Sequence, residues 1–337
     1  MNIDKTDKVH SGDRVLFVNC RGFGDVLQTA ASVKIFKDKF PGTSVTFLTC
    51  PQYTELLSYQ PYIDGVIGGE RLGLRSFLST VDKVRDIGQF DWIMNFQGKS
   101  KIDTLGLLCG IPHKIGTGRR IFYDAELWDW FDSNQCDIRK RESVSIFSPE
   151  PALLFARKIL SNLPEKKIFC IIGAGWKEKM WPVNYWCEFL QKLLAEGWGV
   201  VLNGYGKFEE EFAGKVESEI DNPNVLNLVS KLDFCNMAGV ASQCSIAVGN
   251  DTGPLHLAAL EGVPTLGIFG GTSSEMMGLL MPWFRSIYTT CYKAGCDSTM
   301  KCIRNIKYGC LTSVTPDRVR VVFDQLAMLS NMNLARH

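Results

Sequence analysis

A glycine turn, Arg21–Asp25, follows the apolar run Val15–Asn19 and presents the carboxylate of Asp25. A carboxylate at this point suits a general base that takes a proton from a hydroxyl group. It equally suits the capping of a helix that we expect from about Val26 to Phe40, so both interpretations stay open.

The same turn can be compared with the glycine fingerprint of dinucleotide-binding sites. It contains Gly22 and Gly24, but the third glycine of the G-x-G-x-x-G fingerprint is replaced by Leu27. That replacement disfavours an NAD-dependent oxidoreductase, because the third glycine allows the close packing of helix and strand in such sites.

A second segment, Gly173–Pro182, gathers basic residues after another apolar run. Lys177 and Lys179 lie close to two tryptophans, one of which is Trp176. Ammonium groups at the end of a strand can pair with phosphate, so the segment indicates an anion site. Solvated lysines on a surface loop are the alternative.

The third segment, Val248–Ala259, is the most specific. A strand ends, Asn250, Asp251 and Thr252 offer capping side chains, and Gly253-Pro254 opens a helix. The free N–H groups at a helix start favour a phosphate, which makes this a candidate anion site. His256 falls within the first helical turn and could face the same ligand, or it could be a packing residue.

Apolar runs alternate with helical stretches along the chain, as is typical of parallel α/β units. The polar stretch Phe131–Ser148 interrupts this pattern, so we expect an N-terminal domain over residues 1–150 and a C-terminal domain over 151–337. We expect two Rossmann-like domains whose parallel sheets face a central cleft. The last helix is predicted at Pro316–Leu329, with Thr315 as its N-cap. The strands are expected at Val15–Asn19, Ser44–Thr49, Val66–Ile67, Asp91–Phe96, Lys114–Gly116, Ile168–Ile172, Gly199–Asn203, Val225–Asn227, Ile246–Val248 and Thr265–Phe269.

Composition excludes several classes of function. The chain has 337 residues with 37 Lys and Arg against 36 Asp and Glu, without the basic excess of a nucleic-acid-binding protein. Its apolar runs are far shorter than the roughly 20 residues that span a bilayer. The polar N-terminus lacks the apolar core of a secretory signal, so a cytoplasmic location is expected.

The three segments together resemble the ADP-heptose glycosyltransferases of lipopolysaccharide synthesis, the heptosyltransferases of glycosyltransferase family 9. The resemblance runs over about residues 14–330. The matching motifs are Gly22–Thr29, Asp91–Gly98, Lys179–Pro182, Asn250–Ala258, Gly262–Gly270 and Cys310–Pro316.

This resemblance implies a GT-B fold and an inverting sugar transfer that requires no metal or other cofactor. It implies that the N-terminal domain binds the acceptor and that the C-terminal domain binds the nucleotide sugar. Asp25 would be the general base, and Lys179 would contact the donor phosphate. The further donor contacts would be Gly24, Trp176, Lys177, Asp251, Thr252, Gly253 and His256, with an acid at Glu209 or Glu210. The basic acceptor contacts would be Lys99, Lys101, Arg119 and Arg120.

The partners implied are ADP-heptose, or another nucleotide sugar, and a hydroxyl group on a glycan, glycolipid or protein. Contact with the membrane would be at most peripheral, at the inner face of the cytoplasmic membrane. Two alternatives stay open: a GT-B transferase for another nucleotide sugar, and a catalytically silent nucleotide-sugar-binding scaffold.

Four of the twelve cysteines cluster before the final helix, at Cys291, Cys296, Cys302 and Cys310. Their spacing lacks the C-x2-C pairs of convincing zinc sites. A structural zinc or iron, disulfides and separately packed thiols are therefore all open.

Overall fold

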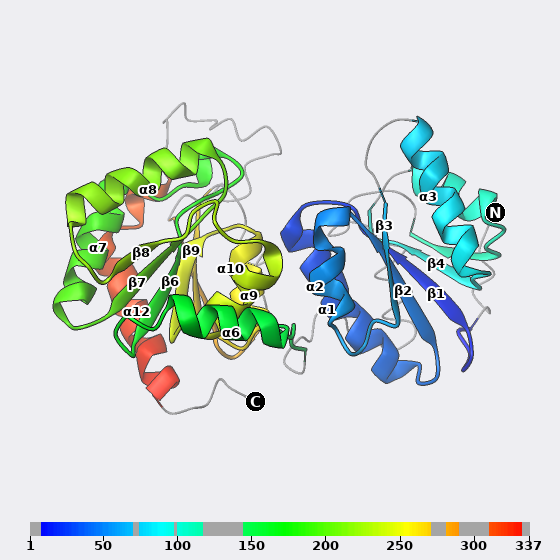
Figure 1. Cartoon of the computed structure of the whole chain (residues 1–337), viewed down its shortest axis with the longest axis horizontal. Coiled ribbons are helices and arrows are strands. Elements are labelled where there is room, and N and C mark those ends of the chain that lie inside the picture. The colour runs from blue at the N-terminus through cyan, green and yellow to red at the C-terminus, as the bar shows by residue number, and fades with distance from the viewer. Residues whose placement is uncertain are drawn as a thin grey trace. The chain divides into compact units, whose positions relative to one another are not determined.

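The computed structural model describes residues 8–69, 74–97, 100–116, 144–270, 281–289 and 310–331. Its contacts divide the chain into two units, Met1–Phe147 and Ser148–His337. Each unit is an α/β domain built on a parallel sheet, which confirms the expected fold class (Figure 1). None of the helices in these ranges is long and apolar enough to cross a membrane.

The first unit has a five-stranded parallel sheet in the order β3-β2-β1-β4-β5. Its elements are β1 (Arg14–Val18), α1 (Phe23–Lys39), β2 (Ser44–Thr49), the 3₁₀ turn Pro51–Tyr53, α2 (Thr54–Ser58), β3 (Gly65–Gly68), α3 (Leu74–Ile87), β4 (Trp92–Asn95), α4 (Ser100–Leu108) and β5 (His113–Ile115).

The second unit has a six-stranded parallel sheet in the order β11-β10-β9-β6-β7-β8. Its elements are α6 (Glu150–Ile159), β6 (Lys167–Ile171), the 3₁₀ turn Lys177–Lys179, α7 (Val183–Ala195), β7 (Gly199–Asn203), α8 (Lys207–Ile220), β8 (Val225–Asn227), α9 (Phe234–Ser242), β9 (Ile246–Asn250), α10 (Gly253–Leu260), β10 (Thr265–Phe269), β11 (Phe284–Tyr288), the 3₁₀ turn Leu311–Ser313 and α12 (Pro316–Asn331).

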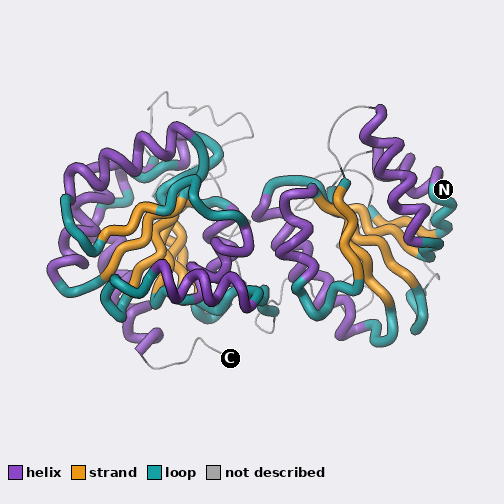
Figure 2. The backbone as a smooth tube through the Cα atoms, viewed as in Figure 1, coloured by secondary structure: helices purple, strands orange, loops and turns teal. Residues whose placement is uncertain are grey.

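Helices cover both faces of each sheet (Figure 2). The central strands of both sheets are buried along almost their whole length, as in β1 and β9. Burial on both faces accounts for the continuous apolar runs of these strands, because each strand must meet a helix layer on either side.

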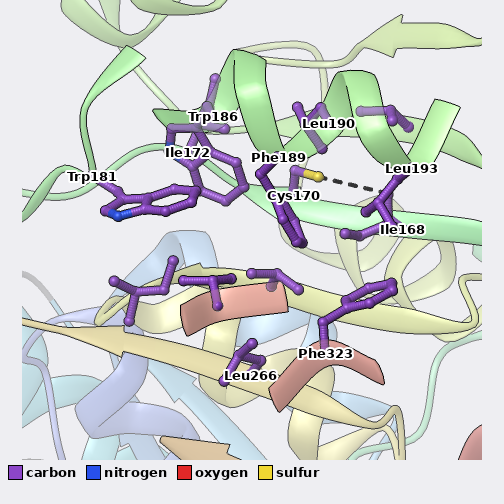
Figure 3. Packing of buried hydrophobic residues seen from close by; sticks show 14 of the residues in the cluster. Ile168, Cys170, Ile172, Trp181, Trp186, Phe189, Leu190, Leu193, Leu266 and Phe323 are labelled. Atoms are coloured by element: carbon purple, nitrogen blue, oxygen red, sulfur yellow. Dashed lines mark hydrogen bonds between the residues drawn. The ribbon is translucent and has the colours of Figure 1, made fainter. Parts of the chain in front are cut away.

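An aromatic cluster forms the core of the second unit between the sheet and helices α7 and α12 (Figure 3). Trp181 and Trp186 meet edge to face at 5.1 Å, and Phe189 meets Phe323 in the same manner at 5.5 Å. The indole of Trp181 is fully buried and donates a hydrogen bond to the carbonyl of Val314 at 2.7 Å. Trp181 therefore fixes the end of the lysine-bearing segment in the core.

Three local expectations need correction. Helix α1 begins at Phe23, so Asp25 lies in its first turn and not in a turn before it. Helix α2 and strand β11 were not expected: α2 has only five residues, and β11 is only partly buried, with Arg285 exposed.

The expected cap at Thr315 is present, since its Oγ1 accepts a hydrogen bond from the Arg318 N–H at 3.5 Å. Most of the stretch Phe131–Ser148 lies outside the described residues.

Candidate active site at the carboxyl ends of the sheets

The strand order of each sheet reverses at one point. In the second unit the chain runs outward from β6 through β7 to β8, then returns to place β9 on the other side of β6. In the first unit the reversal falls between β1 and β4. Ligands of open α/β sheets bind at the carboxyl ends of the strands beside such a reversal. The predicted residues that follow β1, β6 and β9 therefore lie where the topology favours a ligand.

The loop after β6 and the turn after β9 meet at an ion pair. Lys179 Nζ lies 2.8 Å from Asp251 Oδ2, and the exposed fractions of these side chains are 13% and 3%. His256 Nε2 lies 3.8 Å from the other carboxylate oxygen of Asp251, and the His256 side chain is also buried. The structure thus brings together three residues that were predicted from two separate motifs.

Helix α10 begins directly beside this group. Thr252 is its N-cap residue in an extended conformation, and the Thr252 side chain forms no capping hydrogen bond. Gly253 and Pro254 form the first two helical positions. The positive end of the helix dipole therefore lies beside Asp251, where it favours a bound anion.

The two predicted lysines have different environments. Lys177 is exposed, and its Nζ lies 3.9 Å from the centroid of the Phe208 ring. Lys179 pairs with Asp251, and its Nζ lies 5.4 Å from the ring centroid of Trp176, which is 49% exposed. Of the two, Lys179 is the lysine that points toward the start of α10.

The two predicted glutamates also separate. Glu210 is exposed, whereas Glu209 is buried. The Glu209 carboxylate accepts hydrogen bonds from the backbone N–H groups of Tyr205 and Ala174, which lie in the loops after β7 and β6. Burial raises the pKa of the Glu209 carboxyl, and these two hydrogen bonds oppose the rise. Of the two, Glu209 is the glutamate whose carboxylate joins the loops after β6 and β7.

The sequence motifs included Asn250 but did not reveal that its side chain joins strand β9 to the loop after β6. Its fully buried amide donates to the carbonyls of Ile172 and Gly173, and its Oδ1 accepts from the N–H of Trp181. The motif Asn250-Asp251-Thr252 suggested helix capping, and nothing in the spacing showed that Asn250 reaches residues more than 60 positions earlier.

In the first unit, Asp25 lies in the first turn of α1, whose N-cap residue is Gly22. Hydrogen bonds join the turn before α1 to two neighbours. Asn19 Nδ2 donates to the carbonyl of Asp25 and to Thr29 Oγ1, both in α1. The N–H of Cys20 donates to Gln97 Oε1, which follows β4. The carboxylate interacts favourably with the helix start and is also partly open to solvent. Gly22 and not Asp25 is the N-cap residue, so the N-cap interpretation of Asp25 is wrong, while its role as a general base stays a prediction.

The remaining predicted residues are described only in part. Lys101 lies exposed on α4, and Gly24 lies half-buried at the start of α1. The other predicted acceptor contacts, Lys99, Arg119 and Arg120, lie outside the described residues, as do Cys291, Cys296 and Cys302. Cys310 is half-buried before the 3₁₀ turn Leu311–Ser313. Within the described ranges, no three His, Cys, Asp or Glu side chains form a group that could hold a metal ion.

A family model and a curated relative that match this chain both indicate the same protein family. Residues 132–307 match the model of glycosyltransferase family 9 (heptosyltransferase). Lipopolysaccharide heptosyltransferase 1 of Pseudomonas aeruginosa is 25% identical over 296 residues, which cover 79% of this chain and 81% of that protein.

Solved structures show the same fold. The family 9 glycosyltransferase of Veillonella parvula has a TM-score of 0.83 at 17% identity, over 96% of this chain and 99% of that one. The ADP-heptose LPS heptosyltransferase II of Escherichia coli has a TM-score of 0.73 at 16% identity, over 94% and 99%. The shared architecture is the GT-B fold of two parallel-sheet α/β domains.

Proposed function

The chain belongs to glycosyltransferase family 9, the heptosyltransferases, and from that premise we propose that it transfers a heptose from ADP-heptose to a hydroxyl group of the lipopolysaccharide core. The Pseudomonas relative is named for lipopolysaccharide and the Escherichia structure for ADP-heptose, and both names support this choice of substrates. One observation carries the proposal for the donor: Lys179, Asp251 and His256 lie together beside the start of α10.

We assign donor binding to the second unit. When the bond between the anomeric carbon and the diphosphate breaks, negative charge builds up on the leaving ADP. Lys179 and the N–H groups at the start of α10 supply fixed positive potential for that charge. Trp176 and Lys177 lie on the same loop as Lys179, and Thr252 and Gly253 lie at the start of α10. Glu209, in the first turn of α8, accepts a hydrogen bond from the Ala174 N–H of that loop and completes the proposed donor site. Glu210, which is exposed, is the weaker of the two glutamate candidates.

We assign acceptor activation to the first unit. Asp25 takes the proton of the acceptor hydroxyl as its oxygen attacks the anomeric carbon, and the configuration at that carbon inverts. Gly24, in the first turn of the same helix as Asp25, stays a proposed donor contact. Basic residues that include Lys101, and by the family resemblance Lys99, Arg119 and Arg120, would face an acidic acceptor. We propose that this reaction takes place in the cytoplasm, at the inner face of the cytoplasmic membrane.

We propose that the transfer requires no metal ion, because Lys179 and the helix start supply the charge that a divalent cation would otherwise provide. Activity that survives excess EDTA would support this, and full restoration only by added Mg²⁺ or Mn²⁺ would contradict it.

A structural zinc or iron at Cys291, Cys296, Cys302 and Cys310 stays a prediction beside disulfides and packed thiols. Elemental analysis of protein purified without chelator decides between metal and the other two.

The direct test is mass spectrometry of lipopolysaccharide-core acceptors incubated with ADP-heptose and the protein. One added heptose per acceptor, formed much more slowly by the Lys179→Ala variant, would support the proposal. Parallel incubations with UDP-sugars test the first alternative, a transferase for another nucleotide sugar. Stabilisation of the protein by ADP without transfer to any acceptor would instead favour a silent nucleotide-sugar-binding scaffold.

A further inference from the structure

The side chain of Asn250, the last residue of β9, contacts both ends of the segment that carries the proposed phosphate lysine. We name this segment, Gly173–Trp181, the lysine loop. At its beginning, Asn250 Nδ2 donates to the carbonyls of Ile172 and Gly173 at 2.8 and 3.3 Å. At its end, Asn250 Oδ1 accepts from the N–H of Trp181 at 3.0 Å. One amide therefore holds both ends of the loop.

This arrangement places a demand on residue 250 that other side chains meet poorly. The two carbonyls need N–H donors, while the Trp181 N–H needs an acceptor, and an uncharged amide supplies both within one planar group. Asn250 is fully buried, so any of these groups left without its partner would lose its hydrogen bond without gaining one to water. The amide thus specifies the conformation of the backbone at both ends of the loop.

The location of Asn250 links this conformation to the ion pair. Asn250 is the last residue of β9, and the next residue is Asp251, which pairs with Lys179 from the lysine loop at 2.8 Å. The Asn250 side chain and the Asp251 side chain therefore approach the same loop from neighbouring positions of one strand end. The first fixes the loop backbone, and the second contacts Lys179, two residues before the end of the loop.

We propose that Asn250 is a positioning residue of this transferase, which fixes both ends of the lysine loop and so places the Lys179 ammonium for the diphosphate of the donor. This inference deepens the proposed function and rests on its donor site. Asn250 acts through Lys179 and touches no substrate itself. A displacement of the lysine of about 1 Å would weaken a contact that depends on geometry as well as charge.

The first test concerns the loop and needs no substrate. Asn250→Asp keeps the shape and the acceptor for Trp181, but it turns an oxygen toward the carbonyls of Ile172 and Gly173. We expect backbone amides of the lysine loop to exchange with solvent at least about tenfold faster, with β7 and β8 unchanged. Asn250→Ser is the second variant should the aspartate prevent folding. Unchanged exchange in a folded variant would overturn the proposal.

The second test concerns coupling to the lysine, with ADP as the probe. We expect Asn250→Asp to weaken ADP binding in calorimetry by about tenfold or more, but by less than about twofold when Lys179 is already alanine. Equal losses in both backgrounds would overturn the proposal, because a purely structural role would not depend on Lys179. If the wild type bound no ADP, the proposed donor would be wrong, and amide exchange alone would decide the role of Asn250.

A matched control is available at the far edge of the same sheet. Asn227 is the last residue of β8, accepts from the Val229 N–H at 3.0 Å and donates to Glu217 at 2.6 Å. Asn227→Asp disrupts a comparable pair of hydrogen bonds away from the lysine loop. We expect ADP affinity in this variant to match the wild type, and a loss as large as that of Asn250→Asp would count against a specific role of Asn250.

Discussion

Asp251 and Lys179 form a largely buried ion pair. If the proposed donor site is correct, we expect this pair to separate when the donor binds. The aspartate side chain is only 3% exposed, and the lysine contributes to the compensation of its charge. A donor diphosphate would compete for the same ammonium. His256, 3.8 Å from Asp251, then lies in place to interact with the carboxylate when the lysine turns toward phosphate. The three residues are best understood as one unit whose members do not act additively.

The two lysines of the loop give a prediction at this scale. Lys179→Ala removes the charge beside α10 and leaves Asp251 buried without its cation, so we expect ADP affinity to fall about tenfold or more and turnover to fall further. Lys177→Ala, the matched control, loses a contact over the Phe208 ring and should change ADP affinity by less than about threefold. Calorimetry and steady-state kinetics measure both. Equal effects of the two substitutions would show that the phosphate assignment is wrong.

Asp25 gives the second prediction at the scale of single residues. Asp25→Asn keeps the side-chain shape in the first turn of α1 but cannot accept a proton, so we expect turnover to fall about 10²- to 10⁴-fold. ADP affinity should be nearly unchanged. Asp38→Asn, on the last turn of the same helix and paired with Lys34, is the control. Turnover close to that of the wild type would leave Asp25 only the role of a favourable negative charge in the first turn of α1.

At the scale of elements, the sequence predicts the strands well because buried parallel strands read as continuous apolar runs. It predicts the start of α1 less well, since Gly22 and Gly24 suggest a longer turn, whereas the helix accepts Gly24 in its first turn. Motifs located Lys179 and Asp251, because their residue types follow strand ends. They did not reveal the roles of Asn250 and Glu209, whose hydrogen bonds join separate strand ends and have no counterpart in local spacing.

The loop after β6 gives a prediction at this scale. A Cβ atom at Gly173 would overlap Glu209 Oε2, whereas a Cβ atom at Gly175 would meet no atom within 4 Å, and neither glycine has a positive φ. We therefore expect Gly173→Ala to lower the free energy of unfolding by about 1–3 kcal/mol and Gly175→Ala to change it by less than about 0.5 kcal/mol. Urea denaturation measures both.

Repeating the Gly173→Ala and Gly175→Ala measurements in a protein that lacks the Glu209 carboxylate shows whether that carboxylate is the cause of the difference. In a Glu209→Ala background the overlap disappears, so Gly173→Ala should then cost much less than in the wild type. An undiminished cost in that background would mean that Gly173 is required for the backbone itself. The Glu209 carboxylate would then not be the group that excludes a side chain from position 173.

At the scale of the whole molecule, the chain has nearly balanced charge, with a formal net charge of +1, so general charge repulsion contributes little to stability near neutral pH. Individual groups that are at least partly buried then determine how stability depends on pH. Glu261, at the end of α10, accepts a hydrogen bond from Ser148 Oγ at 2.7 Å. Burial raises the pKa of the Glu261 carboxyl from 4.5 to about 8, and the Ser148 hydrogen bond opposes this rise.

The direction in which stability changes with pH follows from whether the folded or the unfolded chain keeps the proton of Glu261. Between about pH 4.5 and 8 the folded protein keeps a proton on Glu261 that the unfolded chain has lost, so stability falls as pH rises, by at most about 1.4 kcal/mol per pH unit. Glu261→Gln resembles the protonated carboxyl and removes this slope. We expect urea midpoints of the variant to match the wild type near pH 5 and to exceed it at pH 8. Midpoints of wild type and variant that run parallel from pH 5 to 8 would show that Glu261 is ionised in the folded protein throughout this range.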